Sequence, residues 1–422
     1  MAVALVMGNM IGSGIFLLPA SLAPYGSVSL AGWAVSAGGA MMLALVFARL
    51  ARMNPAAGGP YAYTREAFGD LPAFLVAWGY WISMWTSLGA LATAFVGYLD
   101  PFIPTIVRQP PLAALLALAV LWLMIGINII GVATAAWVQA ATTVLKVLPL
   151  AAVGLAGLVF FDSSNLVAPA GVVEGVQAIP AVVTLTLWAF LGLESATVPA
   201  ENIQEPDRTI PRATVTGTAL AAVVYVVSSI GVMGVLSPAA LERSTAPFAD
   251  AARAMGGETA AAVIALGAAI SCFGCLNGWA LLVGQLPVAV ARDGLFPALF
   301  GRLTSRGTPA AGMIVAGVLT TALIAMNYTR GLVELFTFMI LLSTLNTLIP
   351  YTFSSLAVFV LRPRRETLGG AMAAVAAIAF VYSFWAIAGA GKDTVYYGFL
   401  LLVSGLPVYV WMQRTRGVRP GV

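Results

Sequence analysis

The sequence predicts an all-α integral membrane protein of about twelve transmembrane helices, arranged as two inverted repeats of five helices followed by two more. Three observations carry this prediction. The chain is 61% hydrophobic and 9% charged over 422 residues, a composition that suits lipid rather than a soluble domain of this size. Two apolar segments are interrupted by glycine at comparable positions. Basic residues are distributed unevenly between alternate loops.

Apolar segments of helical length recur along the chain, each near the ~20 residues that cross a bilayer. The expected spans are 1–22, 28–52, 72–99, 112–132, 135–161, 178–202, 209–236, 259–291, 308–328, 331–361, 368–390 and 394–413. Because the connections are short, residues 1–422 are expected to form a single transmembrane domain. Within it, 1–161 is the first repeat, 178–361 the second, and 368–413 supplies two additional helices.

Glycine interrupts the first and the sixth expected span. The sequences are GNMIGSGIF at 8–16 and WAFLGLES at 188–195. In lipid every backbone N–H and C=O must be bonded within the protein, so a spanning helix unwinds only where its freed groups line a cavity. The two breaks are five spans apart, and an odd number reverses the direction of entry, which predicts inverted repeats. Paired breaks of this kind indicate the binding site of a transporter.

The two breaks present opposite backbone dipoles. The half-helix that starts near Ser13 exposes N–H groups and a positive end, which suits a carboxylate. The half-helix that ends near Trp188 to Leu191 exposes carbonyls and a negative end, which suits an ammonium. Together they are predicted to hold the carboxylate and amino groups shared by all amino acids. For Gly12 and Gly14, the alternative interpretation is a notch for helix packing.

Two charged residues lie deep in expected spans, where charges are costly and usually functional. Glu194 lies in the sixth-span break, and Lys146 lies in the middle of the fifth span. Burial favours the neutral form of a carboxyl group, so Glu194 could exchange a proton during transport or attract a cationic substrate. The alternatives are a packing ion pair and, for Lys146, a side chain that extends to the membrane interface.

Basic residues set the expected orientation. Of the 20 Lys and Arg residues, five fall in loops on one side, Lys146 lies within a span, and the remaining fourteen fall on the other side. The five are Arg108, Arg243, Arg253, Arg330 and Lys392. By the positive-inside rule the richer side is cytoplasmic, which predicts a multi-pass protein with both termini in the cytoplasm.

Composition also excludes several function classes. The chain has no histidine, so a histidine proton relay or metal site is excluded, and no cofactor, metal or nucleic acid is expected. An enzyme would need a cluster of His, Asp, Glu or Ser on facing helices, and an ion channel would need rings of like charge. Cys272 and Cys275 form a CxxC without the βαβ context of a redox motif, and we interpret them as small core residues.

Five stretches resemble the amino acid–polyamine–organocation (APC) superfamily of LeuT-type transporters. They are GNMIGSGIFLLP at 8–19, PAAGGPYAY at 55–63, LWAFLGLESA at 187–196, NGWALL at 277–282 and DGLFP at 293–297. The resemblance covers essentially the whole chain and is nearest to the bacterial arginine/agmatine antiporters. It implies a LeuT-type 5+5 inverted repeat with discontinuous helices 1 and 6, alternating access, and a bacterial inner-membrane location. Relatives of this type form homodimers, and no motif here decides that point.

The resemblance also implies roles for individual residues. Those expected to contact the substrate are Asn9, Met10, Gly12, Ser13, Gly14, Met84, Leu88, Trp188, Ala189, Leu191, Trp279 and Ser343. Those expected to form gates are Trp188 on the periplasmic side, Trp279 in the middle, and Tyr80, Glu194 and Tyr351 on the cytoplasmic side. Those expected to couple transport to ions are Glu194 and Lys146. The carboxylate would meet Asn9 and Ser13, and the distal end of the substrate would meet Ser343.

Two departures from the arginine subgroup leave the substrate open. Leu88 replaces a polar asparagine, and Met84 and Leu91 replace a nearby cysteine and methionine, so the end of the pocket is more apolar. Lys146 is the second departure, and it stands where other members of the superfamily carry a lysine in place of sodium. It indicates sodium-independent transport. The leading expectation is arginine/agmatine exchange, which exports one proton-equivalent per cycle. The alternative is exchange or proton symport of small or aliphatic neutral amino acids.

Overall fold

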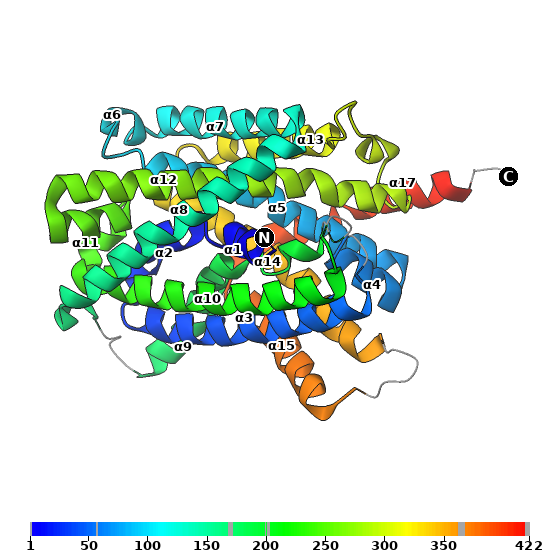
Figure 1. Ribbon diagram of the computed structural model, residues 1–422, viewed down its shortest axis with the longest axis horizontal. Coiled ribbons are helices and arrows are strands. Elements are labelled where there is room, and N and C mark those ends of the chain that lie inside the picture. The colour runs from blue at the N-terminus through cyan, green and yellow to red at the C-terminus, as the bar shows by residue number, and fades with distance from the viewer. Residues whose placement is uncertain are drawn as a thin grey trace.

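The computed structural model describes residues 2–55, 58–167, 172–198, 200, 203–361 and 368–417. Ala56 and Ala57 of one matching stretch, and residues 199, 201 and 202 of the sixth expected span, lie outside these ranges. The described residues form helices and no strands, and nine of the described helices are long and apolar enough to cross a membrane. In Figure 1 most long helices run in roughly one direction, with α1 (Ala2–Met10) near the centre. The predicted all-helical class is confirmed.

The helices follow the predicted spans in order. The first half contains α1 (Ala2–Met10), α2 (Ser13–Leu22), α3 (Val28–Met53), α4 (Pro60–Phe68), α5 (Asp70–Gly97), α6 (Pro104–Val107), α7 (Pro110–Ile130) and α8 (Val132–Val159). The second half contains α9 (Val172–Leu187), the 3-10 turns η3 (Trp188–Phe190) and η4 (Ser195–Thr197), α10 (Pro206–Val235), α11 (Pro238–Glu242), α12 (Pro247–Arg292), α13 (Ala310–Asn327) and α14 (Leu332–Val360). The last helices are α15 (Gly370–Ala388), α16 (Lys392–Val403) and α17 (Leu406–Gly417).

Two spans differ from their predicted form. Helix α12 begins twelve residues before the expected start at 259, and it is kinked at Gly257, whose φ of 76° lies outside helical geometry. The last expected span is divided into α16 and α17 at Ser404 and Gly405. There Trp78 of α5 donates a hydrogen bond to the Leu401 carbonyl at 2.9 Å. This side chain satisfies a carbonyl at the end of α16, where intrahelical partners run out.

Close packing joins the helices around the interrupted segments. Helix α14 packs along α5, α10 packs on α3 and α8, and α12 packs on α8 and α5; α3 and α10 lie side by side in Figure 1. Glycines permit the nearest approach, because a Cβ on Gly231 of α10 would lie 2.6 Å from the Gly154 carbonyl oxygen of α8. Small residues allow membrane helices to approach backbone to backbone, so α8 and α10 form a tight pair.

A polar cluster fastens α4 to the end of α12. Tyr61 donates a hydrogen bond to Asp293 at 2.7 Å, and Arg65 forms ion pairs with Asp293 at 2.7 Å and Asp70 at 3.0 Å. Burial and the hydrogen bond to Asp293 raise the pKa of Tyr61, which keeps the phenol protonated as the donor. The ion-paired side chains are about a third exposed, so each pair contributes roughly 1 kcal/mol or less.

Candidate functional site

The first interruption lies at Ile11 and Gly12, between α1 and α2. Gly12 has φ −142° and ψ −146°, and no side chain caps the start of α2. The first N–H groups of a helix have no intrahelical acceptor, so the segment from Ser13 presents backbone donors and the positive end of the helix dipole. The side chain of Ser13 lies outside what the structure describes. Both the position and the polarity of this break agree with the prediction.

Side chains from α8 and α12 bind the carbonyls at the end of α1. Lys146 donates a hydrogen bond to the Gly8 carbonyl at 2.6 Å. Trp279 and Cys275 both donate to the Asn9 carbonyl, at 3.2 and 3.3 Å. An ammonium is favourable at this negative helix end. Lys146 is fully buried, so the interpretation that it extends to the membrane interface is wrong.

The second interruption follows α9 and touches the first. After η3 the chain turns at Gly192, whose φ of 103° lies in the region that favours glycine. A Cβ on Gly192 would lie 3.2 Å from the backbone of Asn9, and one on Gly14 would lie 2.8 Å from the ring of Trp188. The two broken segments therefore cross at close range, and any side chain larger than hydrogen at Gly14 would disturb the crossing.

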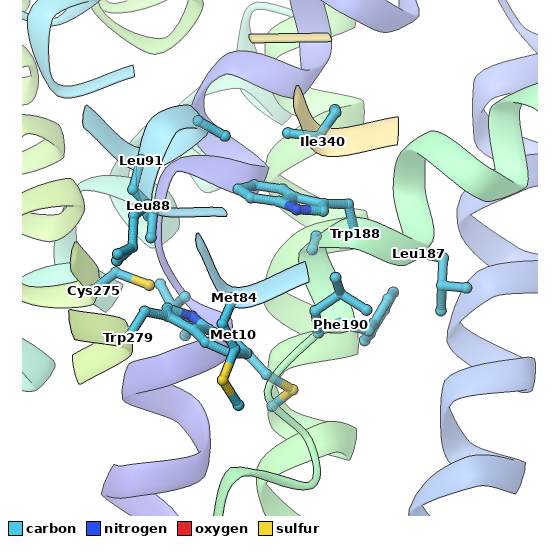
Figure 2. Close-up of a cluster of buried hydrophobic side chains, with 14 of the residues drawn as sticks. Met10, Met84, Leu88, Leu91, Leu187, Trp188, Phe190, Cys275, Trp279 and Ile340 are labelled. Carbon is cyan, nitrogen blue, oxygen red and sulfur yellow. The ribbon is translucent and has the colours of Figure 1, made fainter. Parts of the chain in front are cut away.

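A small cavity lies beside this crossing. Its volume of about 10 Å³ is close to the minimum for one water molecule. Its walls are formed by Asn9, Met10, Gly12, Gly14, Ser87, Leu91, Trp188, Leu191, Cys275 and Trp279. Figure 2 shows the indole rings of Trp188 and Trp279 in one cluster with Leu88, Leu91 and Cys275. An amino acid can enter only if these rings or their helices move.

Seven of the predicted contact residues line this cavity. They are Asn9, Met10, Gly12, Gly14, Trp188, Leu191 and Trp279. Met84, Leu88, Ala189 and Ser343 are not part of its lining. The resemblance implies that the carbonyls of Trp188, Ala189 and Leu191 hold the amino group, and that of Trp188 already accepts a hydrogen bond from the Leu191 N–H at 3.1 Å.

Three lining residues, Ser87, Leu91 and Cys275, were not among the predicted contacts, although Leu91 was placed near the apolar end of the pocket. Ser87 lies four residues before Leu91, and Cys275 lies four residues before Trp279. Residues four apart share a helix face, so helical spacing was the signal that could have found Ser87 and Cys275. Cys275 and Cys272 are buried free thiols, as the core interpretation predicts.

Glu194 links two helices through its carboxylate. Tyr80 of α5 donates to Oε1 and Tyr351 of α14 donates to Oε2, each at 2.5 Å, and the Gly192 N–H approaches Oε2 at 3.3 Å. Glu194 and both tyrosines are fully buried. Three donors replace the water that a buried carboxylate loses. A proton added to Glu194 would compete with a phenol donor, so this junction is sensitive to protonation.

Residues 1–407 match the family described as amino acid permease. The chain belongs to this family. The resemblance to the APC superfamily is thereby confirmed, and this permease is a transporter rather than an enzyme.

Three similar proteins align with most of the sequence of this permease. It is 37% identical to a cadaverine/lysine antiporter of Escherichia coli, over 83% of this chain and 80% of that protein. It is 33% identical to a putrescine transporter of Haemophilus influenzae, over 96% and 94% of the two chains. It is also 33% identical to a putative arginine/ornithine antiporter of Bacillus subtilis, over 97% and 95%.

Proposed function

We propose that this permease exchanges a basic amino acid for an amine, by alternating access around the cavity at the crossing of the two interruptions. The main support for this proposal is the crossing of the two interrupted segments. The start of α2 offers backbone donors to a carboxylate, and the segment after α9 offers backbone carbonyls to an amino group. The names of the relatives, which pair lysine with cadaverine and arginine with ornithine, support a cationic substrate. The arginine/agmatine pair falls within the same class.

The proposal includes a LeuT-type 5+5 inverted repeat within about twelve spans, with both termini in the cytoplasm. Residues 1–161 would be the first repeat, 178–361 the second, and 368–413 two additional helices. The paired interruptions at Gly12 and Gly192 support the repeat. The excess of basic residues in alternate loops supports the orientation.

Within this mechanism, the buried residues divide the work. Trp188 and Trp279 would close over the substrate. The contact of Glu194 with Tyr80 and Tyr351 would form the inner gate and open when the carboxylate changes protonation. Lys146 would hold the end of α1 through the Gly8 carbonyl, a task that a sodium ion would otherwise perform, so we expect sodium-independent exchange.

Charge accounting connects this exchange to protons. A basic amino acid carries a carboxylate that its decarboxylated product lacks, so the product has one more positive charge. If the permease imports the amino acid and exports that product, each cycle removes one proton-equivalent from the cytoplasm. This is the stoichiometry expected of a transporter that supports acid resistance.

A second candidate function is transport of small or aliphatic neutral amino acids. The observation that favours it is the apolar surroundings of the cavity: Met10 and Leu91 line its wall, and Met84 and Leu88 belong to the same cluster of buried side chains (Figure 2). A buried polar group that goes unpaired against such a wall costs about 1–3 kcal/mol.

Reconstitution into proteoliposomes tests the two candidates. Uptake of radiolabelled lysine would be measured with the lumen empty or loaded with cadaverine, and then with unlabelled lysine, arginine, agmatine, alanine and leucine as competitors. We expect uptake to require a loaded lumen, to be inhibited by the basic compounds, and to be unaffected by sodium. Competition by alanine and leucine, without competition by lysine, arginine or agmatine, would favour the neutral transporter instead.

A further inference from the structure

We infer that Ser87 determines specificity for the distal end of the substrate, because its hydroxyl oxygen is held at the cavity wall as an acceptor that selects a side-chain ammonium. The inference rests on the proposed exchange of basic amino acids. It assigns the contact with the substrate side chain to Ser87 of α5. Ser343 of α14 only orients the Ser87 hydroxyl, by a hydrogen bond on the side away from the cavity.

The placement of the two serines separates their tasks. Ser87 lines the cavity, whereas Ser343 is not part of the lining. Their hydroxyl oxygens are 2.7 Å apart, and both residues are buried, with 3% and 0% of their surface exposed. A substrate in the cavity would therefore meet Ser87 and would reach Ser343 only through it.

The hydrogen bonds fix the direction of the Ser87 hydroxyl. A serine has one O–H donor and two acceptor lone pairs. Ser343 lies 2.7 Å from the Ser87 hydroxyl, where either oxygen could donate, and 3.0 Å from the Ser83 carbonyl. Because Ser343 has a single proton, both hydrogen bonds form together only when Ser343 donates to the carbonyl and accepts from Ser87. The proton of Ser87 is thus directed at Ser343, away from the cavity. Ser87 is left with lone pairs alone to offer a substrate.

The rest of the lining makes this acceptor selective. The interruptions supply Asn9, Gly12 and Gly14 on one side and Trp188 and Leu191 on the other, and these segments serve the carboxylate and amino groups. The α5 wall therefore meets the substrate side chain, and Ser87 carries the one hydroxyl among the described lining residues.

The chemistry of the substrate end decides its fit to Ser87. An ammonium supplies donors to the oxygen and can also lie on the face of an indole ring. A methyl group would leave the buried oxygen unpaired, which is unfavourable. A side-chain carbonyl would place two acceptors against each other. The expected order of preference is therefore lysine over norleucine, which is lysine without its ε-ammonium.

The test compares lysine and norleucine binding to purified wild-type protein and to Ser87→Ala, Ser87→Thr and Ser83→Ala. For Ser87→Ala we expect lysine affinity to fall about tenfold to a hundredfold, the effect of losing a hydrogen bond to a charged group, while norleucine affinity holds. Ser87→Thr should restore the preference. Ser83→Ala is the matched control, because its hydroxyl bonds the Tyr80 carbonyl one turn away from the cavity.

A second variant tests the direction of the hydroxyl. In Ser343→Ala the proton of Ser87 is free to turn toward the cavity, so the preference for lysine should weaken although residue 343 does not line the cavity.

Two different failures can be told apart. A wild-type protein that prefers norleucine to lysine would overturn the proposed exchange of basic amino acids, and this inference with it. A wild-type protein that prefers lysine, with the same preference in Ser87→Ala or in Ser343→Ala, would overturn the inference alone. Norleucine binding in each variant reports that the variant is folded.

Discussion

Lys146 and Glu194 are both fully buried charged residues, and each is held by neutral groups. Lys146 donates to the Gly8 carbonyl, and Glu194 accepts from Tyr80 and Tyr351. A buried charge is tolerated when oriented dipoles and donors take the place of water. Dipoles of this kind stabilise a charge without neutralising it, so either residue can respond when its partners move.

Glu194→Gln should flatten the pH dependence of exchange while substrate binding stays measurable. Glutamine cannot gain or lose a proton, and its amide nitrogen would face one of the two phenol donors. Exchange rates in proteoliposomes at acidic and neutral pH measure the effect. Tyr351→Phe is the control, because it removes one donor and keeps the carboxyl group. An unchanged pH profile in Glu194→Gln would show that the residue serves packing only.

Lys146→Ala should reduce exchange by about tenfold or more, because an unpaired carbonyl at the end of α1 costs about 1–3 kcal/mol. Uptake of labelled substrate would be measured with and without sodium for the variant and the wild type. We expect the uptake rate of the wild type to be the same with and without sodium. Wild-type kinetics in Lys146→Ala would show that this lysine is not needed for exchange.

At the scale of elements, glycine lets two interrupted segments occupy the same small space. Gly14 faces the Trp188 ring, and Gly192 faces the backbone of Asn9. At each contact one of the two segments contributes a glycine without a side chain, so the two helix ends approach closely enough to share one ligand. Helix ends placed in this way need few side chains to recognise a head group common to many substrates.

Gly14→Leu should abolish detectable binding, because even its Cβ would lie 2.8 Å from the ring of Trp188. Titration of substrate against purified protein measures this loss. Gly38→Leu on α3 is the matched control, since a Cβ there meets nothing within 4 Å, and its affinity should equal the wild-type value. Equal affinity in Gly14→Leu would mean that the crossing does not hold substrate.

The interruptions could be located from the sequence, because a membrane span unwinds at glycine only where its freed backbone groups find partners other than lipid. The resemblance to the APC superfamily grouped Glu194 with Tyr80 and Tyr351, which the structure brings into contact. The serine at the cavity wall was missed, because the orientation of Ser87 depends on Ser343 in a helix far along the chain. The division of the last span was missed as well, since Trp78 of α5 satisfies the Leu401 carbonyl there.

At the scale of the whole molecule, the helices are joined by contacts of two kinds. Helices α8 and α10 meet backbone to backbone at glycines such as Gly154 and Gly231, a contact that resists separation. The α4–α12 cluster around Asp293 depends instead on partly exposed ion pairs, which break at little cost. We expect movements between access states to break contacts of the second kind first.

The proposed orientation is open to a labelling experiment. Exposed positions would be changed one at a time to cysteine, with Glu242→Cys as the outer reporter and Arg306→Cys as the inner one. An impermeant maleimide applied to intact cells should label Glu242→Cys at once and Arg306→Cys only after permeabilisation. The native cysteines are buried and give little background. The reverse pattern would invert the assigned topology.

The contact between Gly192 and Asn9 has a kinetic consequence. Because the crossing has so little free volume, it can bind only one substrate molecule at a time. The inward and outward half-reactions of the exchange cycle must therefore alternate. Initial rates measured at several lumenal amine concentrations should then give parallel double-reciprocal lines. Two substrate molecules would never be bound together, and each would have to be released before the next could bind.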